Sequence, residues 1–117
     1  MQTTIVQTRT APIIFEVCEK AGLWHPVGGI YMFCKEAFGL LQFTNGSYVP
    51  LYIGKTEDLS SRMASHDKWE PAARRGATKV LAIRVDSERD RDGIERLLIS
   101  QFQPELNTQL MGLGGIR

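Results

Sequence analysis

The sequence predicts a small α/β domain. Three apolar runs rich in β-branched and aromatic residues have the character of strands, and two of the segments that follow them begin with helix-capping residues. Asn45-Gly46, a strong hairpin-turn signal, stands between the first two runs. With 117 residues, the chain is long enough for one domain with a real core and too short for two ordinary ones.

The composition is that of a globular protein, with 43% hydrophobic and 23% charged residues. No apolar run approaches the roughly 20 residues that span a bilayer, and the N-terminus lacks the basic start and apolar run of a signal peptide. We therefore expect a cytoplasmic protein without a membrane partner. Cys18 and Cys34 lack metal-ligand spacing, so we expect free buried thiols.

The region before the first predicted strand divides into two parts. Residues 3–8 alternate weakly in polarity, which leaves a short strand and a loose arm both open. Residues 11–22 fit a helix, and Gly22 suits its C-terminal cap. The apolar side chains on one face of this helix would be Ile14, Val17, Cys18 and Ala21. We expect residues 1–27 to form an arm and a helix that packs on the domain.

Two strands are predicted in the middle of the chain. Gly29 opens the apolar run 30–34, and Gly54 ends the apolar run 49–53. Residues 37–46 are expected to form an enlarged hairpin tip that leaves the pairing of these two strands intact.

The second strand leads into a helix with two candidate catalytic groups. Thr56 is the expected N-cap, and Glu57 and Asp58 suit the positive end of the helix dipole. Arg62 and His66 are four residues apart, so they would share one helix face. The pattern therefore predicts a guanidinium and an imidazole side by side on rigid backbone.

A third strand and two more helices complete the predicted domain. Residues 71–76 suggest a short helix between a proline and a glycine. Residues 79–85 are almost continuously apolar, as in a central strand. Ser87 with Asp90 resembles a capping box, and the helix that it begins runs to about Phe102.

Glu95 lies at the border of the apolar face of this last helix, in register with Leu98 and Phe102. A carboxylate against an apolar stripe loses hydration, and a metal ion or a cationic partner would compensate for that loss. Glu95 is therefore a candidate metal ligand.

The order of several short motifs resembles one family. Gly29-Ile30-Tyr31 is followed by Tyr52-Ile53-Gly54-Lys55-Thr56, and the two strings resemble the signature of the GIY-YIG endonucleases. The further matches are Leu59, Arg62, His66, Glu95 and Asn107. The separation of the two tyrosines is longer than is usual in the family.

The resemblance spans about residues 28–108 and implies both a fold and a set of roles. The implied fold is a small three-stranded, mostly antiparallel central sheet flanked by helices, with a nuclease-like domain at 28–110 and a flexible tail at 111–117. The implied catalytic residues are Tyr31, Tyr52, Lys55, Arg62 and His66. The implied metal ligand is Glu95, and the implied supporting residues are Asn107, Gly29 and Gly54.

Hydrolysis of a phosphodiester needs an in-line water, a base that takes its proton, and positive charge on the transition state. As a lone carboxylate, Glu95 suits one Mg²⁺ ion, with Mn²⁺ as an alternative, because magnesium keeps most of its waters. Arg62 offers a planar fork of donors that stays charged, which suits a phosphate oxygen.

The base remains open among Tyr31, Tyr52 and His66. A tyrosine has a pKa of about 10, which the charges of Lys55, Arg62 or a metal ion would lower. His66 has the better intrinsic pKa. We favour Tyr31 as the base or the water-orienting group.

Charge is uneven along the chain, although the net charge is only +1. Residues 55–84 hold seven basic and four acidic side chains, whereas residues 85–105 hold three basic and six acidic ones. A local basic surface would meet phosphates while the acidic segment supplies the metal ligand. The candidate nucleic-acid contacts are Lys68, Trp69, Arg74 and Arg75. For Trp69, packing on the core is favoured over stacking on a base.

Two functions follow from these patterns. The first is a metal-dependent DNA endonuclease, and the second is a nucleic-acid- or partner-binding module that keeps the fold and cleaves nothing by itself. A domain of this size without a targeting module is expected to recognise branched or damaged DNA, to bind weakly, to form a homodimer, or to depend on a targeting partner protein.

Overall fold

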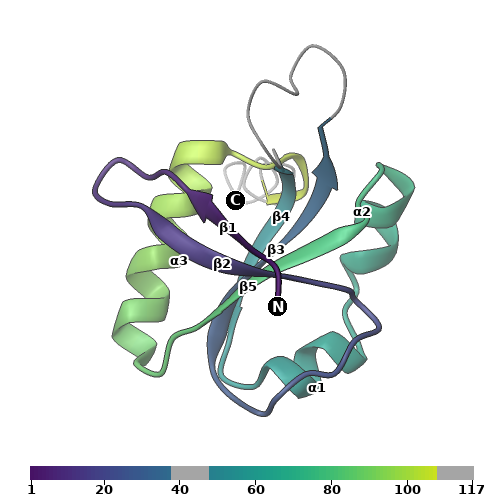
Figure 1. Ribbon diagram of the computed structural model, residues 1–117, viewed down its shortest axis with the longest axis horizontal. Coiled ribbons are helices and arrows are strands. Elements are labelled where there is room, and N and C mark those ends of the chain that lie inside the picture. Colours follow the sequence, from purple (N-terminus) through teal and green to yellow (C-terminus); the bar gives the residue numbers. More distant parts are fainter. Residues whose placement is uncertain (38–47, 108–117) are drawn as a thin grey trace, which may run out of the picture.

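The computed structural model describes residues 1–37 and 48–107, which form one antiparallel sheet and the helices that cover it (Figure 1). The strands are β1 Thr3–Val6, β2 Ile13–Cys18, β3 Gly29–Glu36, β4 Tyr48–Thr56 and β5 Lys79–Arg84. The helices are α1 Leu59–Ala64, α2 Trp69–Arg74 and α3 Glu88–Phe102. None of these helices is long and apolar enough to cross a membrane.

The sheet has five strands in the order β1-β2-β5-β3-β4, so the prediction of a three-stranded sheet is corrected. The two additional strands come from the N-terminal region, where β1 pairs with β2 and β2 pairs with β5. Of the two alternatives for residues 3–8, the structure therefore shows a strand.

The helix predicted over residues 11–22 is wrong, because this segment contains β2. Phe15 is fully buried while its neighbour Ile14 is 60% exposed, which is the alternation of a strand. A dense run of apolar residues matches helical and strand spacing equally well. Pairing with β1 and β5 decides the outcome in favour of the strand.

The remaining strand predictions are confirmed. β5 lies between β2 and β3 and pairs with both, as expected of a continuously apolar central strand. β3 and β4 pair as an antiparallel hairpin that sets Tyr31 opposite Gly54. Residues 38–47, which include most of the predicted hairpin tip, and the predicted tail at 111–117 lie outside the described residues.

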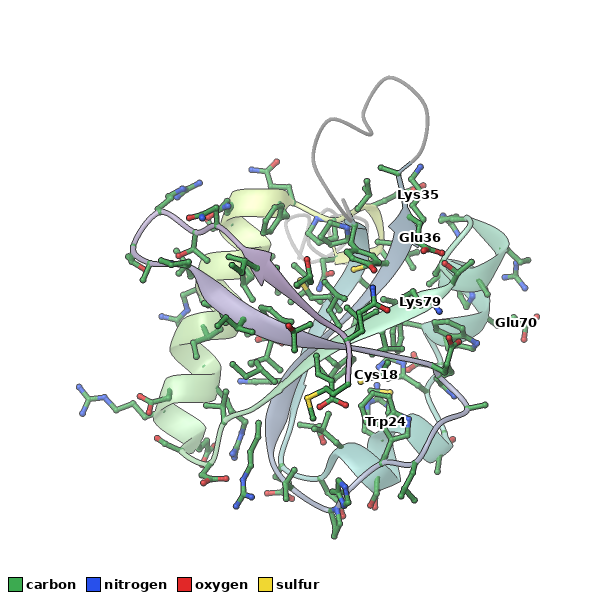
Figure 2. The ribbon with its side chains drawn as sticks, viewed as in Figure 1. Cys18, Trp24, Lys35, Glu36, Glu70 and Lys79 are labelled. Atoms are coloured by element: carbon green, nitrogen blue, oxygen red, sulfur yellow. The ribbon has the colours of Figure 1, made fainter. Side chains whose placement is uncertain are left out.

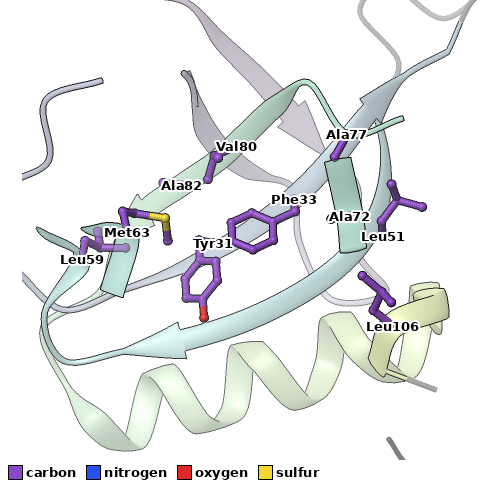
Figure 3. Close-up of a cluster of buried hydrophobic side chains, with 10 residues drawn as sticks. All are labelled: Tyr31, Phe33, Leu51, Leu59, Met63, Ala72, Ala77, Val80, Ala82 and Leu106. Atoms are coloured by element: carbon purple, nitrogen blue, oxygen red, sulfur yellow. The ribbon is translucent and has the colours of Figure 1, made fainter. Parts of the chain in front are cut away.

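Two apolar layers form on opposite faces of the sheet. One layer contains Tyr31 and Phe33 of β3 and is covered by α1 and α2 (Figure 3). Cys18 and Trp24 pack at the margin of this layer (Figure 2). The other layer contains Ile30 and Met32 of β3, and α3 covers it through Leu98. Successive residues of β3 thus alternate between two cores.

The helix ends differ in part from the prediction. Ser87 caps α3 as expected, since its Oγ accepts a hydrogen bond from the Asp90 amide at 3.2 Å. The N-cap of α1 is Asp58 rather than Thr56, because β4 continues through Gly54 to Thr56. The Asp58 carboxylate accepts from the Ser61 amide at 3.1 Å. The short helix predicted at 71–76 is α2, which begins two residues earlier.

Substitution of Phe15 by alanine tests the position of β2 in the sheet. Because Phe15 is fully buried, Phe15→Ala should lower the free energy of unfolding by about 3 to 5 kcal/mol. Ile14→Ala is the matched control on the exposed face and should cost less than about 1 kcal/mol. Urea denaturation measures both. A larger loss for Ile14→Ala than for Phe15→Ala would instead fit the helical face predicted from the sequence.

Candidate active site

Tyr31 is the central residue of the candidate site. It is 1% exposed, and its ring projects from β3 across the edge strand β4 (Figure 3). A Cβ atom at Gly54 would lie 2.5 Å from Cζ of Tyr31, closer than any side chain tolerates. Glycine at position 54 therefore lets the Tyr31 hydroxyl reach the open edge of the sheet.

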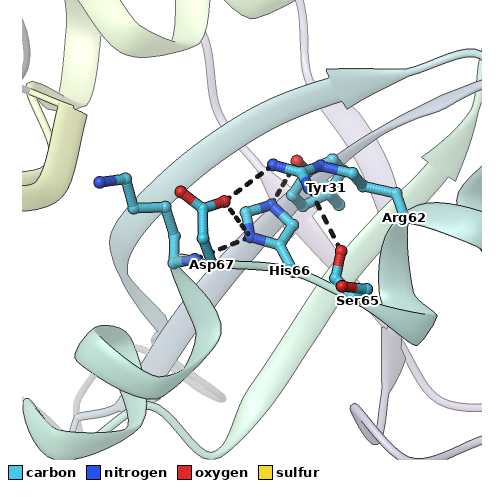
Figure 4. A network of polar contacts seen from close by, with 6 residues as sticks. Tyr31, Arg62, Ser65, His66 and Asp67 are labelled. Atoms are coloured by element: carbon cyan, nitrogen blue, oxygen red, sulfur yellow. Dashed lines mark hydrogen bonds and ion pairs between the residues drawn. The ribbon is translucent and has the colours of Figure 1, made fainter.

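His66 holds this hydroxyl, with 2.7 Å between its Nε2 and the Tyr31 oxygen (Figure 4). The other ring nitrogen, Nδ1, accepts a hydrogen bond from the Lys68 amide at 3.0 Å. In the neutral ring, Nδ1 is therefore the bare nitrogen, and Nε2 carries the proton and donates to Tyr31. The structure thus makes His66 a donor to the tyrosine.

The His66 ring lies in a fully buried aromatic enclosure. Its centroid lies 4.7 Å from Phe33, 5.3 Å from Tyr31 and 5.3 Å from Tyr52, all approximately edge to face. Burial, followed by the charge of Arg62, lowers the pKa of His66 from 6.5 to about 4. The imidazole is therefore neutral at physiological pH.

Arg62 and His66 come together in a way that differs from the prediction. α1 ends at Ala64 and Ser65 is extended, so His66 lies beyond the helix and the two do not share a helix face. Asp67 links them instead. Its Oδ1 lies 3.2 Å from Nη2 of Arg62 and 3.7 Å from Nδ1 of His66 (Figure 4).

Asp67 was not predicted as a site residue. The available signal was its place five residues after Arg62, the cation with which its carboxylate forms an ion pair. The Ser65 carbonyl adds a second acceptor for the Arg62 guanidinium at 3.3 Å. The guanidinium is thus held in one orientation while its side chain remains 35% exposed.

Burial, then the neighbouring Tyr52, raises the pKa of Tyr31 above its usual value. A hydrogen bond from Arg62 and its positive charge oppose this rise, while the charge of Glu95 adds to it. Burial also raises the pKa of Tyr52, whose ring centroid lies 6.3 Å from that of Tyr31. Both phenols are therefore protonated at neutral pH.

Glu95 and Asn107 occupy the outer edge of β4. The Asn107 side chain accepts from the Ile53 amide at 2.8 Å and donates to the Ile53 carbonyl at 2.9 Å. Two residues along the strand, the Lys55 amide contributes to lowering the pKa of the Glu95 carboxyl group. Residues two apart in a strand present their backbone groups to the same side. Glu95 and Asn107 therefore follow one another along the edge that Tyr31 reaches.

Glu95 is half-buried on α3, and burial raises the pKa of its carboxyl group, against the lowering effect of the Lys55 charge. A cation near this carboxylate would compensate for its lost hydration. Within residues 1–37 and 48–107, no group of three or more acidic, histidine or cysteine side chains gathers around a metal position. A single carboxylate completed by water suits Mg²⁺, which takes few ligands from the protein.

Lys55 forms an ion pair with Asp92, one helical turn before Glu95 on α3. Its side chain lies on the α3 side of the sheet, because Lys55 pairs with Ile30 rather than with Tyr31. The charge of Lys55 acts on Glu95, and the positive charge that acts on Tyr31 comes from Arg62. Asp92 was not predicted, although its spacing of three from Glu95 places both on one helix face.

The other predicted residues have mainly packing or ion-pair contacts. A Cβ atom at Gly29 would lie 2.5 Å from the Ile83 carbonyl oxygen, so glycine lets β3 and β5 approach closely. Trp69 packs edge to face on Phe33 at 5.1 Å, which confirms packing over free exposure. Arg74 pairs with Glu70 at 2.7 Å, and Arg75 pairs with Glu105 at 3.1 Å.

Comparison with solved structures identifies one kind of similar protein, the GIY-YIG N-terminal endonuclease domain of UvrC from Thermotoga maritima. The magnesium-bound domain is 29% identical, with a TM-score of 0.54, over 71% of this chain and 85% of that one. A variant with phenylalanine in place of one tyrosine, bound to the catalytic divalent cation, is 30% identical, with a TM-score of 0.52, over 71% and 84%. No model of a protein family and no curated protein matches the chain.

Alanine at position 54 tests the close approach of Tyr31 to β4. The new Cβ would displace the Tyr31 ring, so Gly54→Ala should cost about 1 to 3 kcal/mol of unfolding free energy. Gly93→Ala is the control, since nothing lies within 4 Å of its Cβ position on α3. That change should stabilise the protein by up to about 1 kcal/mol. Thermal denaturation measures both, and equal melting temperatures for Gly54→Ala and wild type would contradict the contact.

The neutral state of His66 predicts a pH dependence of stability. The unfolded chain binds a proton at this residue below about pH 6.5, whereas the folded chain binds it only near pH 4. The unfolding free energy should therefore fall as the pH is lowered from 6.5 towards 4. Urea denaturation of wild type and His66→Gln at pH 7 and pH 5 measures this. The variant should lose less stability between these two pH values, and parallel losses would contradict a buried neutral imidazole.

Proposed function

Because the chain belongs to the GIY-YIG endonuclease family, we propose that it is a divalent-metal-dependent endonuclease that hydrolyses DNA phosphodiester bonds. The observation that supports this best is the environment of the Tyr31 hydroxyl. It lies over the backbone of the edge strand β4, in contact with His66, with the charges of Arg62 and Glu95 acting on it. This arrangement combines a proton acceptor, a fixed cation and a metal-binding carboxylate.

In this proposal the Tyr31 hydroxyl first releases its own proton to solvent, and the resulting phenolate orients the attacking water and takes its proton. Two donors meet its oxygen, one from His66 and one from Arg62, and both stabilise the deprotonated form. A divalent cation on Glu95 would supply further positive charge beside the tyrosine and the phosphate.

His66 acts here as a positioning residue and not as the base. Its Nε2 proton is donated to Tyr31, and its Nδ1 lone pair is occupied by the Lys68 amide. A ring whose pKa is lowered to about 4 remains neutral, so it does not compete with Arg62 for the phosphate charge. Tyr52 contributes to the aromatic enclosure that keeps the ring in this orientation.

Arg62 binds the phosphate group in this proposal. The Ser65 carbonyl and the Asp67 carboxylate fix its guanidinium and leave part of the donor fork directed outward. A planar cation held this way stabilises the negative charge that develops on non-bridging oxygens, without reorganisation during the reaction. Lysine would present only a point charge at this place.

Replacement of Glu95 tests the proposed metal site. Cleavage of supercoiled, linear, single-stranded and branched DNA is assayed with Mg²⁺, with Mn²⁺ and with EDTA. Wild type should nick DNA with either metal and not with EDTA. Glu95→Gln should reduce the rate at least about a hundredfold, because a catalytic metal contributes several kcal/mol to the barrier.

Glu88→Gln is the matched control, since Glu88 lies two turns earlier on α3, and Glu95 rather than Glu88 is the α3 carboxylate that acts on Tyr31 and Tyr52. It should retain full activity. Undiminished cleavage by Glu95→Gln would show that Glu95 does not bind the catalytic metal. DNA binding without cleavage on every substrate would favour the module that keeps the fold and cleaves nothing.

A further inference from the structure

The basic side chains around the candidate site differ in whether a carboxylate neutralises them. Most are paired within the described residues, namely Lys55, Arg62, Arg74, Arg75, Lys79 and Arg84. Lys20 and Lys68 are exceptions: across residues 1–37 and 48–107, neither ammonium group forms an ion pair. Both nevertheless lie close to His66.

Lys20 is fixed to the aromatic layer of the site. Its ammonium group lies 5.8 Å from the centroid of the Trp69 ring, within the range of a cation–π contact. Its backbone carbonyl accepts a hydrogen bond from Nε1 of Trp24 at 3.0 Å. Because Trp24 and Trp69 both pack on the core that contains Tyr31, these contacts position the lysine before any ligand binds.

Lys68 contacts the same imidazole through its backbone amide. The Lys68 amide donates to Nδ1 of His66, the ring nitrogen that does not face Tyr31. The charges of Lys20 and Lys68 both contribute to the lowered pKa of His66, after burial and Arg62. Two lysines from different parts of the chain therefore act on one imidazole, Lys20 beside Trp69 and Lys68 through its backbone contact with the ring.

The charges of Arg62, Lys20 and Lys68 all act on His66, and like charges repel one another unless anions compensate them. Asp67 compensates Arg62, but no carboxylate of the described residues pairs with Lys20 or Lys68. A nucleic-acid strand carries one negative charge per nucleotide, and lysine is a common phosphate ligand. The chemistry that suits this pair of lysines is therefore a row of successive backbone phosphates.

We propose that Lys20 and Lys68 bind the DNA backbone phosphates next to the scissile phosphate, so that the strand passes beside the Trp69 surface. The proposal rests on the proposed function in one respect, namely that DNA is the substrate. It adds Lys20, from the segment between β2 and β3, to the DNA-binding residues. It gives Arg74 and Arg75 smaller roles, since Glu70 and Glu105 pair with them. Because these lysines would contact only phosphates, the DNA binding that they provide should not depend on the base sequence.

DNA binding in EDTA tests the proposal without cleavage. Affinity for labelled DNA of two unrelated sequences is measured between about 50 and 200 mM salt by fluorescence anisotropy. Lys20→Gln and Lys68→Gln should each weaken binding several-fold for both sequences. Each should also reduce the slope of log K against log salt by about 0.7 to 0.9, and the double variant by about twice that. Lys20→Arg should keep most of the slope.

Arg89→Gln is the matched control, because it removes the same charge from α3 on the opposite face of the sheet. The slope of log K against log salt for Arg89→Gln should equal that of wild type. Thermal denaturation confirms that the variants fold. In cleavage assays, Lys20→Gln should raise KM and leave kcat within about twofold, since the lysine lies away from the reacting atoms.

The outcomes separate this proposal from the proposed function. Unchanged salt slopes for Lys20→Gln and Lys68→Gln, equal effects of Arg89→Gln, or no DNA binding by wild type would overturn it. If wild type cleaves while both lysine variants behave like it, only the phosphate contacts are refuted. If wild type binds DNA through these lysines and cleaves nothing with either metal, the phosphate contacts hold and the nuclease proposal fails.

Discussion

The contact between the Tyr31 ring and the backbone of Gly54 is the constraint on which the rest of the site depends. Any side chain at position 54 would occupy the space of the Tyr31 ring. The position of the Tyr31 hydroxyl therefore depends on glycine at position 54. The antiparallel register of β3 and β4 brings the two residues opposite each other. The packing of His66 and Arg62 then follows from the position of the hydroxyl.

The edge of β4 has an unusual role for an edge strand. Exposed backbone groups at a sheet edge invite pairing with other chains, and proteins generally cover or interrupt them. Here the Ile53 amide and carbonyl are bound by Asn107, and the Lys55 amide, two residues along, acts on the charge of Glu95. The contacts of Asn107 cover part of this edge, and the candidate metal ligand Glu95 lies next along it, so protection of the strand and assembly of the candidate site share one stretch of β4.

The sequence predicted much of the site, because its groups lie in two strands and two helices whose order is readable from short motifs. Tyr31, Tyr52, Arg62 and His66 do gather in the structure, and Glu95 influences both tyrosines electrostatically. The five-stranded sheet was not predictable in the same way. Its N-terminal strands join the sheet because β2 pairs with β5, which lies more than sixty residues further along the chain, and the local hydrophobic periodicity does not indicate that pairing.

The contacts that the sequence did not predict are similarly non-local or depend on where a helix stops. Asp67 joins Arg62 and His66 only because α1 ends at Ala64 and the chain turns back. Lys20 reaches the site because two tryptophans from different segments hold it. Helix and strand propensities describe neighbours along the chain, and these contacts join segments that folding alone brings together.

The position of Asn107 has a consequence for synthesis of the protein in the cell. This residue holds Ile53 from 54 positions further along the chain. A ribosome releases the chain from its N-terminus, so the tyrosines, Arg62 and His66 emerge well before Asn107 can bind β4. The edge of the candidate site is therefore completed only after Asn107 has emerged, and a nascent chain that already carries Tyr31, Tyr52, Arg62 and His66 still lacks the contact that fixes the edge strand.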